Sequence, residues 1–427
     1  MNYEEALEYI HGITWQSRKP GLSRINELME LMGHPEKSTR YIHIAGTNGK
    51  GSTAAMLSSI LTKTGYKTGL FTSPHIYRFN ERMQINGEPI SDEDVCKLAD
   101  YIKQFTDKMT ETPTEFELIS AFGFEYFKRR ECDIVVLEVG LGGLMDSTNV
   151  IECPEVAVLA AIGLDHTGLL GNSLVEIARE KAGIIKPGCS AVIYRQEPEV
   201  EAVFIDKCKE VGADYYLCEP DAFVRKDCDW DSQTFDYKDM KDLVISLTGS
   251  YQLKNASMVL KTIEILNKKG YNVNDTALRE GLISTQWPCR FQVLTKEPVF
   301  IIDGAHNPQG IKATADSLRL HLKGRKVIFI IGVMSDKDLN TMIPYIDEYA
   351  LEYIAVTPNY EGRAMKAEVL GDYLKRFNRP VTVAESIQSG VETSLKKAGR
   401  DGIVCAIGSL YMPVDVKEAL VKLGVLN

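Results

Sequence analysis

The chain has 427 residues, which is too long for one ordinary hydrophobic core, so two domains are expected. With 44% hydrophobic and 25% charged residues it has a globular composition, and no apolar run reaches the roughly 18 residues of a membrane span. The net charge of −10 argues against bulk binding of nucleic acid, which requires a basic face.

Short, β-branched apolar runs alternate with amphipathic stretches along most of the chain. The runs are typical of strands that are buried on both faces, and they lie at residues 41–45, 67–71, 133–138, 156–161, 190–194, 299–302, 326–331, 353–356, 381–384 and 403–407. Helical patterns lie between them, among others at residues 52–64, 174–184, 255–267 and 367–377. This alternation predicts parallel sheets with right-handed crossovers, and an antiparallel patch is expected within residues 213–247.

A new series of strands and helices begins after the turn-like WPCRF segment, which places a boundary near residues 291–298. We therefore expect a two-domain α/β protein. A P-loop-type domain with a mostly parallel sheet would cover residues 1–295, and a smaller Rossmann-like α/β domain would cover residues 296–427. In such folds ligands bind at the carboxyl ends of the strands.

The strongest motif is GTNGKGS, residues 46–52, between an expected strand and an amphipathic helix. Glycines let backbone amides approach phosphate oxygens, and the helix amino terminus adds positive potential. Lys50 supplies a flexible charge for the β- and γ-phosphates. The loop departs from the standard form, because Ile44 stands where the first glycine belongs and Gly51 replaces the hydroxyl residue after the lysine. A glycine-rich turn is the alternative, but the strand–loop–helix context favours nucleotide binding.

Polar residues also follow other expected strands of the first half. Ser73 comes after the strand at 67–71, Glu138 ends the next, and His166 follows the strand at 156–161. Magnesium prefers oxygen ligands and keeps several waters, so Ser73 and Glu138 suit it, and an imidazole can complete a site. Each residue alone could be a turn cap, a salt-bridged strand end or a core histidine. Their shared position at strand ends favours a metal site.

The second half repeats this arrangement. Asp303 ends a strand and could hold a ribose hydroxyl, while His306 and Asn307 would face the same crevice. The alternative is a tight Asx-type turn. Ser409 follows the last strand and could form another anion contact. Lys181, taken alone, would be an ordinary solvated charge on a helix.

Together these segments resemble the folylpolyglutamate synthase/dihydrofolate synthase family, a branch of the Mur-ligase-like ATP-dependent amide ligases. The matching segments are GTNGKGS at 46, TSPH at 72, FNER at 79, EVGLGG at 138, LDHTGLLG at 164, REKAGIIKPG at 179 and DGAHNP at 303. The resemblance implies an enzyme that adds L-glutamate to dihydropteroate or to the γ-glutamyl tail of a tetrahydrofolate. The reaction would pass through an acyl phosphate and release ADP and phosphate.

The resemblance also implies roles for particular residues. ATP would be bound by Asn48, Gly49, Lys50, Gly51, Ser52, Thr53, Asn255, Arg290 and Asp303. Two Mg²⁺ ions would be held by Ser73, Glu138, His166 and a carbamate on Lys181, with a monovalent cation as a further candidate. The substrate side would include Thr114, Phe116, Glu117, Asp146, His306 and Ser409. Catalytic roles would fall on Lys50, His166, Lys181, Arg290 and His306.

Two positions depart from the family pattern. Cys289 stands where the family usually has the glycine of a P-G-R-F segment, so the local backbone is expected to differ. Leu144 holds a position that is often arginine, which affects the substrate contacts expected near Asp146.

Two other functions fit part of the pattern. One is a different Mur-type ligase that acts on a peptidoglycan precursor, and the other is a P-loop ATPase switch that hydrolyses ATP without a small carboxylate. The nine cysteines are scattered without a C-x-x-C pair, and the first residues are acidic where a signal peptide would be basic. We therefore expect a cytoplasmic monomer whose partners are folate or dihydropteroate and L-glutamate, with no nucleic acid and no membrane.

Overall fold

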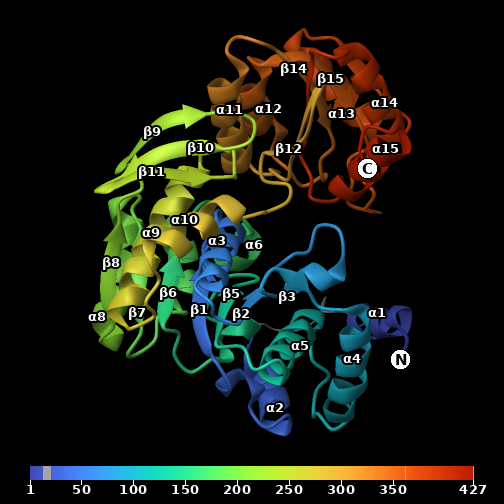
Figure 1. The fold of residues 1–427 in the computed structure, drawn as a ribbon. Helices are drawn as coiled ribbons and strands as arrows, with labels where there is room; N and C mark the ends of the chain where they lie inside the picture. The colour runs from blue at the N-terminus through green and yellow to red at the C-terminus, as the bar shows by residue number, and fades with distance from the viewer. Residues whose placement is uncertain (13–20, 361, 427) are drawn as a thin grey trace. The chain divides into compact units, whose positions relative to one another are not determined.

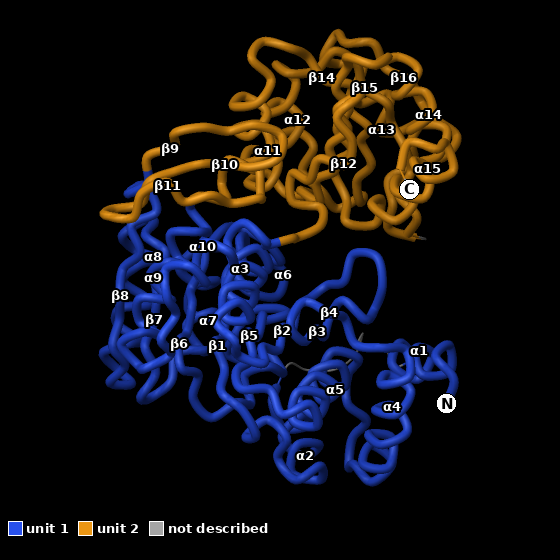
Figure 2. The backbone as a smooth tube through the Cα atoms, viewed as in Figure 1, with its two compact units in different colours: residues 1–223, 254–285 blue, residues 224–253, 286–427 orange. Residues whose placement is uncertain are grey.

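The computed structural model describes residues 1–12, 21–360 and 362–426, which form an α/β protein with three sheets (Figure 1). Within these ranges, no helix is both long and apolar enough to cross a membrane. The chain divides into two compact units (Figure 2). Unit 1 comprises residues 1–223 and 254–285, and unit 2 comprises residues 224–253 and 286–427.

Unit 1 contains an eight-stranded sheet in the order β4-β3-β2-β5-β1-β6-β7-β8. The strands from β2 to β8 along this order pair in parallel, whereas β3 and β4 pair antiparallel at one edge. The strands are β1 Arg40–Ala45, β2 Thr68–Phe71, β3 Met83–Ile85, β4 Glu88–Pro89, β5 Ile134–Glu138, β6 Val156–Leu159, β7 Ser190–Tyr194 and β8 Asp214–Cys218.

Helices cover this sheet, and its central strands are buried throughout. In β5, Val135 and Leu137 belong to the apolar cluster of α1, α2, α4 and α5, while the alternate residues Ile134 and Val136 are equally buried. Burial on both faces is what the continuous apolar runs of the sequence predict. The helices are α1 Tyr3–His11, α2 Ser23–Leu31, α3 Lys50–Lys63, α4 Asp92–Thr106, α5 Glu115–Arg129, α6 Thr167–Leu170, α7 Leu174–Ala182, α8 Pro198–Val211, α9 Gln252–Lys268 and α10 Asp275–Ser284, with short 3₁₀ turns η1 Pro35–Lys37, η2 Phe79–Arg82 and η3 Ser147–Val150.

Unit 2 contains a six-stranded sheet in the order β12-β13-β17-β14-β15-β16, parallel except for β12. Its strands are β12 Gln292–Lys296, β13 Val299–Asp303, β14 Val327–Ile331, β15 Ala350–Ala355, β16 Val381–Val383 and β17 Ile403–Ile407. Its helices are α11 Pro308–Leu322, α12 Leu339–Asp347, α13 Ala367–Leu374, α14 Ile387–Ala398 and α15 Pro413–Lys422, with the 3₁₀ turn η4 Lys375–Phe377.

A three-stranded sheet, β9 Phe223–Cys228, β10 Gln233–Tyr237 and β11 Met240–Ile245, also groups with unit 2. The reason lies in its contacts with α11. His321 Nε2 lies 2.9 Å from the carbonyl oxygen of Thr248, and the His321 ring stacks on Trp230 with centroids 4.7 Å apart. The backbone N–H of Ser250 donates to Ser317 Oγ over 2.9 Å. The compact units therefore do not follow the ranges 1–295 and 296–427 expected from the sequence.

The α/β fold class with mostly parallel sheets is confirmed, and each of the expected strands coincides with an observed one. The antiparallel patch is confirmed for β10 and β11. Within the same expected range, however, β8 pairs in parallel with β7 and extends the large sheet.

Candidate active site

The phosphate loop lies between β1 and α3, at the carboxyl edge of the unit 1 sheet. Gly49 has a φ of 87°, and a Cβ atom there would lie 2.5 Å from Asn255 Oδ1. Both the left-handed backbone and the close approach require glycine. Asn255, on α9, thus lies directly against the loop, as expected for a residue of the nucleotide site.

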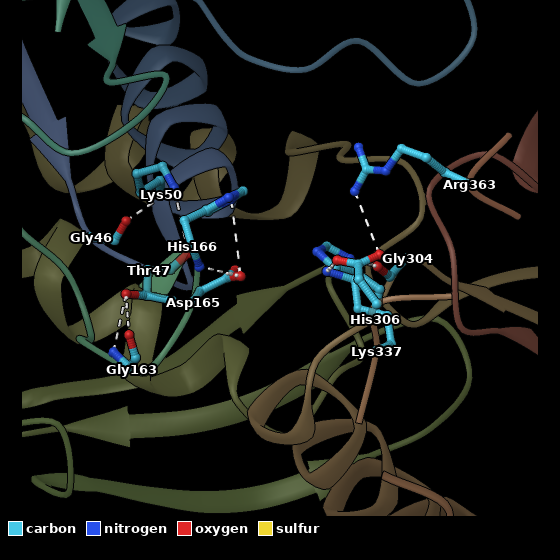
Figure 3. A network of polar contacts seen from close by, with 11 residues as sticks. Gly46, Thr47, Lys50, Gly163, Asp165, His166, Gly304, His306, Lys337 and Arg363 are labelled. Atoms are coloured by element: carbon cyan, nitrogen blue, oxygen red, sulfur yellow. Dashed lines mark hydrogen bonds and ion pairs between the residues drawn. The ribbon is translucent and has the colours of Figure 1, made fainter. Parts of the chain in front are cut away.

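Hydrogen bonds fix the loop to the segment after β6 (Figure 3). The N–H of Thr47 donates to the carbonyl of Ala161 over 2.8 Å. Thr47 Oγ1 accepts from the N–H of Gly163 over 3.0 Å and donates to its carbonyl over 3.1 Å. Thr47 was not among the site residues expected from the sequence, although its place inside the glycine-rich motif is the signal that could have identified it.

Lys50 is the first residue of α3, and its ammonium turns back over the loop (Figure 3). Lys50 Nζ donates to the carbonyl of Gly46 over 3.1 Å and lies 3.9 Å from Glu138 Oε1 at the end of β5. The strand order places β5 next to β1, so the lysine and the carboxylate meet because their strands are neighbours.

Glu138 and Ser73 form a second contact at the same edge. Glu138 Oε2 accepts from the backbone N–H of Ser73 over 3.2 Å, and Ser73 Oγ accepts from Arg82 NH1 over 3.0 Å. Arg82 Nε also donates to His75 Nδ1, and burial together with the Arg82 charge lowers the pKa of His75 to about 4. Arg82 therefore orients Ser73, a role that the sequence analysis did not assign.

These oxygen donors fit magnesium, a hard cation that uses few protein ligands and keeps waters and phosphate oxygens. Among the described residues, no group of three or more His, Cys, Asp and Glu side chains could hold a metal by itself. His166 has a φ of 49° at the start of α6, and its ring lies 4.0 Å from Asp165 Oδ1 (Figure 3). Its side chain is 56% exposed, so it is not the core histidine that the alternative reading predicted.

Lys181 differs from an ordinary helical lysine because it is only 4% exposed. Burial, reinforced by the nearby charge of Lys50, lowers the pKa of Lys181 to about 7, against an opposing effect of Asp146. Within the described part of the chain, its ammonium has no hydrogen-bond or ion-pair partner. A neutral amine is therefore available at neutral pH, close to the lysine of the phosphate loop.

The expected substrate residues of α5 form its amino-terminal cap. Thr114 Oγ1 accepts from the N–H of Glu117 over 3.3 Å, and Glu117 Oε2 accepts from the N–H of Thr114 over 2.6 Å. Buried Arg24 binds both carboxylate oxygens of Glu117 over 3.0 Å. Phe116 packs against Gly140, where a Cβ would lie 2.3 Å from the ring. The carboxylate of Glu117 is thus occupied by hydrogen bonds to Arg24 and Thr114 of the same chain, whereas Phe116 lines the glycine-rich loop after β5.

In unit 2, Asp303 ends β13 and is buried. Its carboxylate accepts from Thr314 Oγ1 over 2.7 Å and from the N–H of Ala305 over 3.1 Å. Burial raises the pKa of Asp303 to about 6, against the opposing effects of Thr314 and of the Arg290 charge. Arg290 NH1 would lie 3.1 Å from a Cβ on Gly304, so the two expected nucleotide residues flank one loop.

Cys289 has a φ of 56° and is fully buried, and its carbonyl accepts from the N–H of Gly304 over 2.8 Å. This left-handed backbone is the conformation that glycine adopts without steric cost. Cys289 thus takes a backbone conformation that suits glycine, the residue usual at this position of the family pattern.

The loops that follow β13, β17, β14 and β15 meet at one edge of the unit 2 sheet. The N–H of Gly408 donates to the carbonyl of Ala305 over 3.0 Å, which brings Ser409 beside His306. A Cβ on Gly408 would lie 2.5 Å from the carbonyl of Gly332, and the N–H of Ser335 donates to the carbonyl of Arg363.

This edge also carries two cations that the sequence analysis missed, Lys337 and Arg363 (Figure 3). Both approach Asp336, with Lys337 Nζ at 3.3 Å and Arg363 NH2 at 3.5 Å from its carboxylate oxygens. His306 Nδ1 lies 2.8 Å from the carbonyl of Gly304 in the same loop cluster. The rule that polar residues follow parallel strands could have identified Lys337, because it lies six residues after the end of β14.

Comparisons with known proteins agree with this geometry. Residues 44–263 match the Mur ligase middle domain, and residues 289–410 match the glutamate ligase domain of Mur ligases. Dihydrofolate synthase/folylpolyglutamate synthase from Bacillus subtilis (strain 168) is 36% identical over 429 residues, which cover 98% of this chain and 99% of that protein. Folylpolyglutamate synthase from Lacticaseibacillus casei is 34% identical over 433 residues, covering 98% and 99%.

Solved structures are similar over the whole chain. The apo form of the L. casei enzyme superimposes with a TM-score of 0.85 at 32% identity, covering 99% of this chain and all of that one. E. coli FolC in complex with DHPP and ADP has a TM-score of 0.88 at 27% identity, covering 99% of each chain. This chain belongs to the folylpolyglutamate synthase/dihydrofolate synthase family of ATP-dependent amide ligases.

Proposed function

We propose that this protein uses ATP to join L-glutamate to a folate-type carboxylate, either that of dihydropteroate or the terminal γ-carboxyl of a tetrahydrofolate. The observation that carries the proposal is the pair of Lys50 and Glu138 at the carboxyl edge of the unit 1 sheet, with the charge of Lys50 also acting on the buried Lys181. A structural turn would not require a lysine with a strongly lowered pKa next to a phosphate loop.

The acceptor carboxylate attacks the γ-phosphorus of ATP, the bond to ADP breaks, and an acyl phosphate forms. The amine of glutamate then attacks the acyl carbon, and the tetrahedral intermediate releases inorganic phosphate and leaves an amide. Lys50 neutralises charge on the phosphoryl group, and the glycine loop supplies backbone N–H groups. Asn255 and Asp303 would position the nucleotide, with Arg290 as a further positive group.

Magnesium, when bound with ATP, supplies charge neutralisation on the phosphate oxygens. Ser73 and Glu138 would hold one ion, and His166 together with a carbamate on Lys181 would hold a second. The neutral amine of Lys181 would combine with carbon dioxide and release a proton, which gives a carbamate, an anionic oxygen donor. The lowered pKa supports this assignment, because only the neutral amine reacts. A monovalent cation remains a further prediction.

At the unit 2 edge, His306 and Ser409 would contact the incoming glutamate, and Lys337 and Arg363 would bind its carboxylates. Ionic pairing with a carboxylate is the chemistry that a half-buried Lys337 and an exposed Arg363 offer. On the acceptor side, Phe116 lines the loop after β5, next to Thr114 at the cap of α5.

The test is phosphate release from Mg-ATP with glutamate plus either dihydropteroate or tetrahydrofolate, with each component omitted in turn. Turnover that requires glutamate and one pterin supports the ligase and identifies its acceptor. Turnover with ATP alone would favour a P-loop ATPase switch, and a requirement for a peptidoglycan precursor would favour a different Mur-type ligase. The cytoplasmic location and the monomeric state stay predictions, to be checked by fractionation and by light scattering.

A further inference from the structure

The polar segment Asp146–Asn149, which follows the glycine-rich loop of β5, is turned into the protein. Asp146, Ser147 and Asn149 are each 5% exposed, and Thr148 is fully buried. Buried polar side chains require hydrogen-bond partners, so the partners of this segment indicate what it holds in place. The partners of these four side chains differ from those of a substrate-binding residue, because they are groups of the protein itself.

A short relay connects β1 to this segment. Thr148 Oγ1 lies 2.5 Å from Asp146 Oδ1 and 2.9 Å from His43 Nε2. Because the carboxylate only accepts, the threonine donates its proton to Asp146 and accepts the N–H of His43. Burial, with a smaller effect of Lys186, lowers the pKa of His43 to about 3, which keeps the ring neutral and fixes one N–H in the relay. His43 lies on β1, whose next turn is the phosphate loop.

Asp146 in turn holds the glycine-rich loop. Its carboxylate accepts from the N–H groups of Leu141 over 2.8 Å and of Thr148 over 3.0 Å, and from the N–H of Gly140. With the hydroxyl of Thr148, these donors engage a carboxylate that has about four lone-pair sites. Little capacity is left for a substrate atom, although the sequence resemblance placed Asp146 on the substrate side.

The glycine-rich loop packs directly on the end of α7. The N–H of Leu144 donates to the carbonyl of Glu180 over 2.7 Å, and a Cβ on Gly143 would lie 2.9 Å from Lys181 Cα. Asn149 Nδ2 donates to the carbonyls of Leu144 and Gly183 over 3.1 Å each. The contacts of the segment therefore end on both sides of Lys181.

We propose that His43, Thr148 and Asp146 form a positioning relay that sets Lys181 in register with the phosphate loop. The inference rests on the proposed ligase function, in which Lys181 helps to hold the second metal ion. None of the relay residues is a catalytic residue, because each acts through the next. The strand β1, which leads into the phosphate loop, and the helix α7, which carries Lys181, are thereby joined through buried hydrogen bonds. The geometry of these bonds tolerates little displacement.

The test compares Thr148→Val, which removes the hydroxyl at nearly constant shape, with Thr148→Ser, which keeps it. Thr262→Val is the matched control, because Thr262 is also buried and its hydroxyl donates to the carbonyl of Met258 on its own helix, α9. Thr148→Val should lower kcat about 10- to 100-fold with little change in the KM for the pterin, since a small misplacement of a reacting group has effects of this size. Thr148→Ser and Thr262→Val should retain kcat. A rise in the pterin KM alone would overturn the relay in favour of direct substrate contact.

A second readout is independent of catalysis. Lys181 is labelled with acetic anhydride in carbon dioxide-free buffer, and the modified peptide is quantified by mass spectrometry. The buried amine should react several times faster in Thr148→Val than in wild type, Thr148→Ser or Thr262→Val. Unchanged labelling would overturn the relay even if the ligase activity is established. Conversely, if the wild-type protein shows no substrate-dependent phosphate release, the ligase proposal is overturned. The labelling experiment still decides whether the relay exists. Should Thr148→Val fail to fold, His43→Leu compared with His43→Gln provides the same contrast.

Discussion

Lys50 Nζ lies 3.9 Å from Glu138 Oε1; Lys50 begins α3, which follows β1, and Glu138 ends the neighbouring strand β5. An ammonium and a carboxylate in this position can hold a phosphate and its magnesium ion together. Glu138→Gln keeps the shape and removes the charge. We expect phosphate release to fall about 100-fold or more, and the magnesium concentration for half-maximal activity to rise.

Glu125→Gln is the matched control for that variant, because Glu125 is a buried carboxylate on α5 that pairs with Arg129. It should leave the magnesium dependence unchanged. If Glu138→Gln also keeps the wild-type magnesium dependence, Glu138 is only a counterion for Lys50.

Gly49→Ala tests the phosphate loop. The φ of 87° costs a non-glycine residue about 1 kcal/mol, and the new Cβ would lie 2.5 Å from Asn255 Oδ1. We expect a large rise in the KM for ATP in steady-state phosphate release. Gly65→Ala is the control, since Gly65 has a φ of 101° with no atom within 4 Å of its Cβ position. Equal effects of both variants would show that backbone strain alone matters, without a role for the Asn255 contact.

Lys181 should make stability depend on pH. Its pKa of about 7 in the folded chain lies below the value of 10.5 for a free lysine. Between these values the unfolded chain binds a proton that the folded chain lacks, so the free energy of unfolding should rise with pH. Below pH 7 the cost of burying the charge is fully present. Lys181→Met should therefore be more stable than wild type at pH 6, by a few kcal/mol, in carbon dioxide-free buffer.

Urea denaturation from pH 6 to pH 9 measures this difference, which should shrink as the pH rises. Added bicarbonate should then raise the Tm of wild type and not that of Lys181→Met, because a carbamate forms only on the folded lysine. A constant difference between the two proteins across this range would contradict the lowered pKa.

The central strands could be predicted from the sequence because strands that are buried on both faces consist of continuous apolar runs. In β5 every residue is buried, and the run IVVLE contains no polar residue before Glu138. The strand-end positions of Ser73 and Glu138 follow from parallel topology. The strands β9 and β11 carry charged residues such as Lys226, Lys241 and Asp242, so their local pattern was weak.

Other features depend on contacts between distant residues. The grouping of residues 224–253 with unit 2 results from the contacts of Thr248, Ser250 and Trp230 with α11, which no local pattern reveals. Lys181 looked like a solvated helical lysine because its burial comes from the loop after β5, which packs on the end of α7. Resemblance to the family identified it where local chemistry could not.

Asp303 should give ATP use an acid limit. Its pKa of about 6 means that protonation below this pH removes the charge that orders Ala305. The KM for ATP should therefore rise as the pH falls below about 6. Thr314→Val removes a hydrogen bond that lowers this pKa, so the limit should shift to higher pH. A limit that stays at the same pH in Thr314→Val would assign the titration to another group, including ATP itself.

Lys337 and Arg363 should determine the affinity for glutamate. Lys337→Met and Arg363→Met each remove one charge from the edge where His306 and Ser409 also lie, and a lost ionic hydrogen bond costs about 1.5–3 kcal/mol. The KM for glutamate should therefore rise roughly 10- to 100-fold, with the KM for ATP nearly unchanged. Lys396→Met is the control, because Lys396 is an exposed lysine of α14 that pairs with Glu392 along its own helix. A rise in the KM for ATP with no change for glutamate would move these cations to the nucleotide, and the glutamate subsite would then have to lie elsewhere.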